Sequence, residues 1–211
     1  MLVRHGASQP AVPGEPFPLL DGHGNPALAA EGEEQAIYVA ERLAIEPLSA
    51  LFITPLQRTA QTAAPLAGVL GLEPVVVPEL REVFLGDWEG GEFRKRLADG
   101  DPIAMSMAVK QRWDVIPGAE PEEAFAARVR VGVERIAARH ADELVVAVVH
   151  GGVIGQVIAL ATGARGFGFT GADNASLSHI VVTPERWIVR CYNDTSHLRS
   201  RFSTAPEPPA G

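Results

Sequence analysis

The chain contains 211 residues, of which 46% are apolar and 21% are charged, so its composition is that of a globular domain rather than of a disordered chain. Its net charge of −8 disfavours nucleic acid as a partner, and its single cysteine, Cys191, excludes an intrachain disulfide and a cysteine-rich metal site. No apolar run approaches the roughly 18 to 20 residues that a membrane span needs, so we expect no membrane insertion.

The amino terminus begins directly with a short apolar segment. No basic patch followed by a long apolar region precedes it, so the sequence lacks the pattern of a secretory signal, and we expect a cytoplasmic protein. Only three residues precede Arg4, which makes this first strand, at residues 1–3, short for a central position, where strands usually run about 5 to 6 residues.

Apolar periodicity then alternates between helices and strands. The first half is predicted to contain a helix at 30–44, a strand at 50–53, a helix at 56–70 and a strand at 75–77. The second half is predicted to contain a helix at 121–141, a strand at 144–149, a helix at 153–161, and closing strands at 176–182 and 187–192. This alternation predicts an α/β fold, a three-layer sandwich with a mostly parallel central sheet and helices on both faces.

Three segments define the organisation of the chain. Residues 144–149 are apolar on both alternating faces, which is typical of a central strand covered by helices on both sides. Residues 90–120 lack strand signals and are predicted to form a small helical cap insertion over the strand ends. Residues 203–211 are rich in proline and cannot build a core, so we expect a flexible tail after a single domain at 1–202.

Charged and polar side chains follow several of the predicted strands. Arg4 and His5 come at the end of the first strand, and His150 with Gly151 follows the strand at 144–149. Arg58 falls in the first turn of the helix after the strand at 50–53. Open α/β sheets bind ligands at the carboxyl ends of their strands, so these side chains are expected to share one site. Glu82 follows the strand at 75–77 and adds a carboxylate to the same edge.

Four blocks of sequence, in this order, resemble the histidine phosphatase superfamily in its phosphoglycerate-mutase-like branch. They are Leu-Val-Arg-His-Gly at 2–6, Pro-Leu-Gln-Arg-Thr-Ala-Gln-Thr-Ala at 55–63, Leu-Arg-Glu-Val-Phe-Leu-Gly-Asp-Trp-Glu-Gly at 80–90, and Val-Val-His-Gly-Gly-Val-Ile at 148–154. The resemblance covers roughly residues 1 to 200.

The resemblance implies a role for each matching residue. His5 would be the nucleophile that accepts the phosphoryl group, and Glu82 would be the proton donor, with Asp87 and Glu89 as the rival carboxylates. The phosphate oxygens would be held by Arg4, Arg58, His150 and the backbone of Gly151 and Gly152. These residue types suit the chemistry, because a neutral imidazole is a good nucleophile at phosphorus and neighbouring cations both keep it neutral and stabilise the transferring group. The cations would also replace the metal ion of other phosphoryl-transfer enzymes, so no metal or cofactor is expected.

The sequence departs from the family pattern directly after the first block. The mutase-like pattern has a glutamate after Arg-His-Gly and an asparagine four residues later, where this chain has Ala7 and Ala11. A polar contact to phosphate or substrate is therefore missing, with Ser8 and Gln9 as nearby replacements. This departure counts against a mutase and leaves the nucleophile untouched.

Three functions are compatible with these residues. The favoured one is a metal-independent phosphomonoesterase that acts through a phosphohistidine on a small phosphorylated metabolite. The alternatives are a phosphoglycerate-type phosphomutase, which requires a water-poor pocket, and a non-catalytic phospho-ligand binding module, which would need no proton donor.

The substrate would be selected by the cap region. The candidates there are two methionines, a tryptophan and three arginines, which line a mouth, face solvent or pack internally: Met105, Met107, Trp113, Arg94, Arg96 and Arg112. His23, His140, His179 and His197 show no metal-ligand spacing and are expected at the surface or in packing. A homodimer through the late strands is compatible with the pattern, which does not demand one.

Overall fold

A six-stranded sheet forms the centre of the protein in a computed structural model that describes residues 1–12 and 14–198. Its strand order is β5-β4-β6-β1-β7-β8. The bounds are Leu2–Arg4 for β1, Leu48–Ile53 for β4, Val75–Val76 for β5, Leu144–Val149 for β6, Leu177–Val182 for β7 and Trp187–Asp194 for β8. The neighbouring pairs from β5 to β1 are parallel, whereas β7 is antiparallel to both β1 and β8, so the prediction of a mostly parallel sheet is confirmed.

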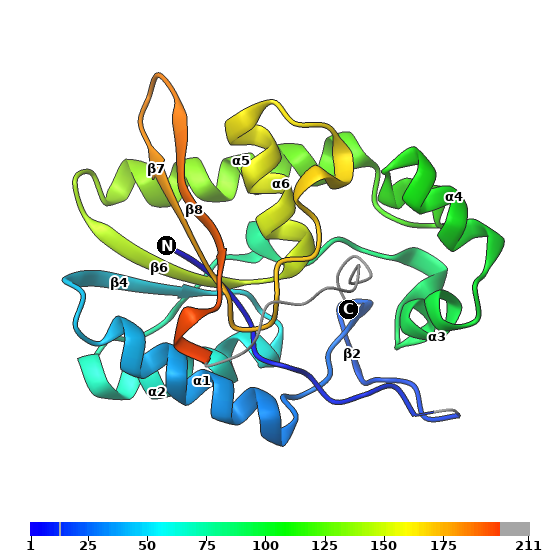
Figure 1. The fold of residues 1–211 in the computed structure, drawn as a ribbon, viewed down its shortest axis with the longest axis horizontal. Coiled ribbons are helices and arrows are strands. Elements are labelled where there is room, and N and C mark those ends of the chain that lie inside the picture. Colours follow the sequence, from blue (N-terminus) through cyan, green and yellow to red (C-terminus); the bar gives the residue numbers. More distant parts are fainter. Residues whose placement is uncertain (13, 199–211) are drawn as a thin grey trace.

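Helices cover both faces of this sheet, as predicted (Figure 1). Helices α1 (Ala30–Leu43) and α2 (Gln57–Leu70) lie on one face, and α5 (Glu122–Arg139) and α6 (Gly151–Thr162) lie on the other. The α/β three-layer sandwich expected from the sequence is the fold of this protein.

Strand β6 shows why the central run of the sequence is apolar on both sides. Val146 and Val148 pack with α1 and α2, while Ala147 and Val149 pack in the cluster that contains α5 and α6. Successive side chains of a strand point to opposite faces, so a strand buried between two helical layers needs apolar residues at every position. The prediction that 144–149 is central is confirmed, because β6 lies between β4 and β1.

Strand β1 is as short as the sequence indicates. Its three residues pair with β6 on one side, and Leu2 and Val3 pair with β7 on the other. The terminal ammonium of Met1 donates a hydrogen bond of 2.7 Å to the carbonyl oxygen of Val145 and continues the pairing. Parallel pairing with β6 brings the residues that follow both strands to the same edge of the sheet.

The predicted helical cap is present between β5 and α5. It contains α3 (Glu92–Ala98), α4 (Pro102–Lys110) and the 3-10 turn η3 (Trp113–Val115), and it lies beyond one end of the sheet (Figure 1). Helix α4 begins where Asp101 accepts a hydrogen bond from the Ile103 N–H and proline occupies the first helical position.

A small hairpin opposite the cap is missing from the sequence-based predictions. Strands β2 (Leu19–Leu20) and β3 (His23–Gly24) pair antiparallel around Asp21 and Gly22, which have φ values of 48° and 84°. An Asp-Gly pair is a strong signal for a two-residue hairpin turn. Two-residue strands, however, are too short to show an alternating apolar pattern.

Two expectations about the chain organisation stay predictions. The single domain at 1–202 is not tested by these observations, and the tail at 203–211 lies outside the described residues. Within the described ranges, no helix is long and apolar enough to cross a membrane.

Candidate active site

Two histidines meet at the carboxyl ends of neighbouring strands. His5 follows β1, and His150 follows β6 as the cap residue of α6. The His5 N–H donates a 3.0 Å hydrogen bond to the carbonyl oxygen of Val149, which continues the strand pairing to the sheet edge. The two imidazole rings lie edge to face with centroids 5.2 Å apart. The structure thus brings together the two histidines that the sequence assigned to one site.

The His5 ring is fixed by one partner on each nitrogen. Nδ1 lies 2.8 Å from the carbonyl oxygen of Gly6, and Nε2 lies 3.1 Å from Nε of Arg58. A carbonyl oxygen only accepts and an arginine nitrogen only donates, so the neutral ring carries its hydrogen on Nδ1 and keeps a lone pair on Nε2. Nε2 is therefore the atom that can attack an electrophile.

Both histidines are held in the neutral form. Burial, followed by the charges of Arg58 and Arg4, lowers the pKa of His5 well below its usual value of 6.5. Burial and Arg58 likewise lower the pKa of His150. An uncharged imidazole is the reactive form of a nucleophilic histidine, so this environment favours nucleophilic chemistry near neutral pH.

His150 is oriented by a threonine that the sequence analysis did not assign to the site. Its Nε2 lies 2.9 Å from Oγ1 of Thr54, the first residue after β4. Its Nδ1 is buried and has no hydrogen-bond partner among the described residues. A buried polar atom without a partner is costly, so this nitrogen is suited to an oxygen of a bound ligand. The position of Thr54 at a strand end is the signal that could have identified it.

The two predicted arginines approach the same site from separate elements. Arg4, in β1, is 9% exposed and donates to the carbonyl oxygen of Ala172. Arg58, in the first turn of α2, is 7% exposed and also donates a 3.0 Å hydrogen bond to the carbonyl oxygen of Gly24. Burial lowers the pKa of Arg58 to about 10, so it stays charged at neutral pH.

Glu82 lies against the start of α6. Its carboxylate accepts hydrogen bonds from the N–H of Val83 at 2.9 Å and from that of Gly152 at 3.1 Å. A Cβ atom at position 152 would lie 2.5 Å from Oε1 of Glu82, so only glycine allows this approach. The sequence predicts that the Gly151 and Gly152 N–H groups approach phosphate. In the structure, the Gly152 N–H donates to the Glu82 carboxylate instead. Glu82 follows two residues after η1 (Pro78–Leu80) and lies at the start of α6.

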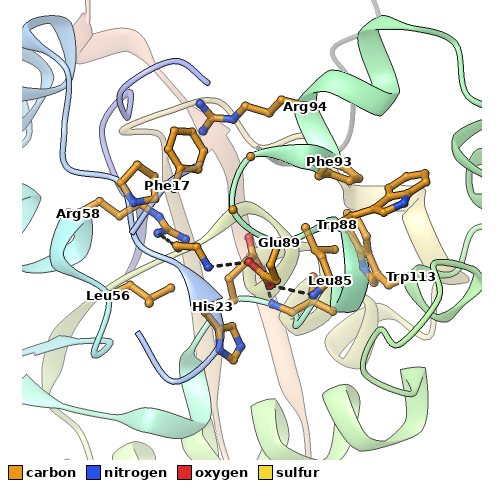
Figure 2. A pocket seen from close by; sticks show the side chains of 16 residues that line it. Phe17, His23, Leu56, Arg58, Leu85, Trp88, Glu89, Phe93, Arg94 and Trp113 are labelled. Atoms are coloured by element: carbon orange, nitrogen blue, oxygen red, sulfur yellow. Dashed lines mark hydrogen bonds between the residues drawn. The ribbon is translucent and has the colours of Figure 1, made fainter. Parts of the chain in front are cut away.

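A cleft opens beside this site, between the hairpin and the cap (Figure 2). Of the site residues, Arg58 and Glu82 line it, and these two side chains together with the buried His5 and His150 are called the floor of the cleft below. Phe17, His23 and Arg58 line one side, and Trp88, Phe93 and Trp113 line the other. His23 was expected at the surface or in packing. It packs on Phe84 with ring centroids 5.1 Å apart, but it also lines the cleft because the hairpin folds toward the cap.

Glu89, one of the two carboxylates that rival Glu82 in the sequence, also lies in the cleft. Its carboxylate accepts hydrogen bonds from the N–H of Gly24 at 2.6 Å and of Leu85 at 2.9 Å, and burial raises its pKa. Since the Gly24 carbonyl accepts from Arg58, Glu89 fixes the segment that holds Arg58. Asp87, the other rival to Glu82, is not among the residues that line the cleft.

The cap residues that the sequence suggests for substrate selection lie in different environments. Trp113 and Arg94 line the cleft, while Met107 is buried in the core and Met105 is exposed. Arg96 and Arg112 form ion pairs with nearby carboxylates. Among residues 1–12 and 14–198, no group of three or more His, Cys, Asp or Glu residues is arranged to hold a metal ion.

The two alanines that depart from the family pattern lie in tight surroundings. A Cβ atom on Gly32 of α1 would lie 2.0 Å from the Ala7 carbonyl oxygen, so the chain passes very close to this helix. A Cβ atom on Gly91 would lie 3.3 Å from the methyl group of Ala11. Of the two suggested replacements, Ser8 accepts a 2.8 Å hydrogen bond from Arg94 of the cap through its hydroxyl group, and Gln9 accepts one of 2.9 Å through its backbone carbonyl.

Comparisons with known proteins identify the family of the chain. Residues 1–195 match the family model of the histidine phosphatase superfamily (branch 1). The chain is 32% identical over 204 residues to a metal-independent phosphoserine phosphatase of Arabidopsis thaliana, covering 95% of this chain and 83% of that protein. It is 29% identical over 202 residues to the phosphoglycerate mutase-like protein 4 of the same plant, covering 94% of this chain and 86% of the relative.

The solved structures include a mycobacterial glucosyl-3-phosphoglycerate phosphatase in complex with VO3. It superposes with a TM-score of 0.76 at 28% identity, over 92% of this chain and 98% of the other. The family match spans the strand ends that carry His5, Arg58, Glu82 and His150. The resemblance inferred from four sequence blocks is confirmed, and the chain belongs to the histidine phosphatase superfamily.

Proposed function

We propose that the protein is a metal-independent phosphomonoesterase that hydrolyses a small phosphorylated metabolite through a phosphohistidine at His5. The observation that carries this proposal is the state of the His5 ring. The ring is buried and neutral, with Nδ1 bound to the Gly6 carbonyl and the Nε2 lone pair directed at the Arg58 guanidinium. A lone pair beside a fixed cation can attack a phosphorus atom whose oxygens that cation binds.

In the first step, Nε2 of His5 forms a bond to phosphorus as the bond from phosphorus to the substrate oxygen breaks. The departing oxygen takes a proton from Glu82, which lies at the floor of the cleft, and leaves as an alcohol. Arg4, Arg58, His150 and the N–H of Gly151 bind the phosphoryl oxygens. The partnerless Nδ1 of His150 supports this assignment, because a phosphoryl oxygen would give it a hydrogen-bond partner.

In the second step, water attacks the phosphohistidine and gives a proton to the Glu82 carboxylate. The bond between nitrogen and phosphorus breaks, inorganic phosphate leaves, and His5 returns to its neutral state. Arginine charges balance the phosphoryl group throughout, so these residues supply the stabilisation that a metal ion supplies in other phosphoryl-transfer enzymes. The names of the relatives support small phosphorylated metabolites as substrates. The cytoplasmic location and the homodimer stay proposals.

The test is hydrolysis of p-nitrophenyl phosphate by the purified chain, with and without EDTA. We expect turnover that EDTA leaves unchanged, and a phosphorylated enzyme after quenching in alkali, since phosphohistidine is labile in acid. Absence of turnover would favour the binding module, and loss of activity in EDTA would refute the metal-free mechanism. A phosphorylated substrate that carries a second, free hydroxyl group distinguishes the phosphatase from the mutase: the phosphatase releases inorganic phosphate from it, whereas the mutase transfers the phosphoryl group to the second hydroxyl.

A further inference from the structure

Arg94 of helix α3 crosses the mouth of the cleft. Its side chain extends from the cap toward Phe17 on the opposite side (Figure 2). The guanidinium is fixed by three contacts. Nη1 donates to the carbonyl oxygen of Gln9 at 2.9 Å, Nη2 donates to Oγ of Ser8 at 2.8 Å, and the central carbon lies 5.3 Å from the centre of the Phe17 ring. A fixed positive charge therefore faces the cleft.

This charge is not balanced by a neighbouring carboxylate. The other two arginines of the cap have such partners, since Arg96 pairs with Glu92 and Asp101, and Arg112 pairs with Asp114. In the part of the chain that the structure describes, no carboxylate oxygen lies within 4.0 Å of a nitrogen of Arg94, and all its partners are neutral. Partial burial lowers its pKa, and the neutral partners stabilise the charge without neutralising it, so an anion in the cleft would find a net positive charge here.

Within the described residues, Arg94 makes no hydrogen bond to the floor of the cleft, although its charge contributes to the low pKa of His5. Arg58 is the arginine that contacts the nucleophile, at 3.1 Å from Nε2 of His5, whereas the hydrogen bonds of Arg94 go to Ser8 and Gln9. A phosphoryl group at His5 therefore meets Arg58. The alcohol part of the same substrate is then expected to lie along the cleft, which Phe93, Arg94 and Trp113 line on the side of the cap.

We propose that Arg94 determines specificity by binding a second anionic group, a carboxylate or a second phosphate, on the alcohol part of the substrate. This inference rests on the proposed phosphatase function and narrows its substrates to phosphomonoesters of acidic alcohols. Guanidinium groups recognise carboxylate and phosphate through paired hydrogen bonds, so the preference should be strong and should depend on arginine rather than on charge alone.

The test compares substrates that differ only in the second charge. One pair is O-phosphoserine against O-phosphoethanolamine, which lacks the carboxylate, and the other is propanediol bisphosphate against its monophosphate. We expect the wild type to prefer the more anionic member of at least one pair in kcat/KM, and the pair that shows the preference identifies carboxylate or phosphate as the ligand. In Arg94→Met, kcat/KM for that member should fall about tenfold or more, chiefly through KM, while kcat/KM for its counterpart without the second anionic group changes less than about twofold.

Two further variants separate recognition from a structural role. Lys95→Met removes a charge from the next position of α3, where the side chain is 61% exposed, and it should leave both pairs unchanged. Arg94→Lys should restore only part of the preference. Equal losses for both members of a pair in Arg94→Met would show that Arg94 merely links the cap to residues 8–9, and would overturn the inference. A wild type that hydrolyses p-nitrophenyl phosphate without preference in either pair would also overturn it, whereas failure on p-nitrophenyl phosphate would refute the proposed function itself.

Discussion

The floor of the cleft and its mouth are built in different ways. On the floor, side chains are held by backbone groups at the ends of strands and helices. Gly6 fixes His5, Gly24 fixes Arg58, and Gly152 fixes Glu82. At the mouth, the aromatic side chains and Arg94 come from the cap and face the hairpin. A backbone N–H or carbonyl group is present whatever side chain its residue carries, whereas the cap lines the cleft with side chains.

The floor and the mouth are therefore suited to different tasks, phosphoryl transfer and substrate selection. The floor uses residue types dictated by phosphoryl transfer, and its position follows from the pairing of β1 with β6. The mouth can vary in sequence without disturbing that pairing, so it is the region where substrate preference can be adjusted. Substitutions on the floor should therefore affect all substrates, whereas substitutions at the mouth should affect only some.

The largest effect is expected at the nucleophile. His5→Ala removes the covalent route and should lower kcat on every phosphomonoester by about three orders of magnitude or more. His140→Ala is a matched control, because His140 lies at the end of α5, before the start of β6, and contacts Glu143 and Phe52. Steady-state turnover of p-nitrophenyl phosphate measures both. A His5→Ala variant that keeps a tenth of the wild-type rate would contradict the assignment.

The floor was easier to predict from the sequence than the mouth, for a physical reason. The strand at 144–149 is recognisable because burial on both faces requires an uninterrupted apolar run, and a residue that follows such a strand must lie at the sheet edge. That rule locates His150 and, through the parallel partner β1, His5. It needs no knowledge of distant side chains.

The parts that were missed depend on contacts between segments far apart in the chain. Glu89 enters the cleft because its carboxylate meets the N–H of Gly24, 65 residues away, and no local pattern encodes that pairing. The hairpin that contains His23 has strands of two residues, too short for a periodic signal. Arg94 and Arg96 are two residues apart on one helix, and only the carboxylates around Arg96 decide which of them is neutralised.

The next effect concerns the proton donor, where both glutamates of the cleft are candidates. Each carboxylate accepts two backbone hydrogen bonds, so the contacts alone do not separate Glu82 from Glu89. Glu82→Gln should lower kcat about a hundredfold on alkyl phosphates and far less on p-nitrophenyl phosphate, whose leaving group barely needs a proton. Glu89→Gln should instead lower kcat/KM by a similar factor, about tenfold, on both substrates, because it loosens Gly24 and therefore Arg58.

A control variant is measured with the same two substrates. Glu79→Gln removes a carboxylate three residues before Glu82, from an ion pair with Arg135 outside the cleft, and should leave the ratio between the two substrates unchanged. If Glu89→Gln shows the leaving-group dependence and Glu82→Gln does not, the proton donor is Glu89, whose pKa is raised by burial. The floor would then include a residue attached to the hairpin.

The smallest expected effect is on the stability of the protein. It distinguishes the floor from the mouth, because it depends on the buried histidines of the floor, His5 and His150. The folded protein holds His5 and His150 with pKa values well below 6.5, whereas in the unfolded chain they titrate near 6.5. Between these values the unfolded chain binds more protons, so the free energy of unfolding should be greatest above pH 6.5 and decrease as the pH falls. Each histidine contributes a slope approaching about 1.4 kcal/mol per pH unit.

Urea unfolding at several pH values between 7 and 5 measures this slope. Because other titrating groups also contribute to it, the slope of the wild type is compared with that of a variant that lacks one histidine. His5→Gln keeps a polar side chain of similar reach and removes one titrating imidazole, so its slope should be shallower than that of the wild type by about 1.4 kcal/mol per pH unit. His150→Gln should show the same change. Parallel curves for wild type and both variants would mean that these imidazoles accept protons as readily in the folded protein as in the unfolded chain. The lone pair on His5 would then not be maintained by burial and the neighbouring arginines, and the fraction of enzyme with an uncharged nucleophile would fall as the pH drops through the ordinary titration range of histidine.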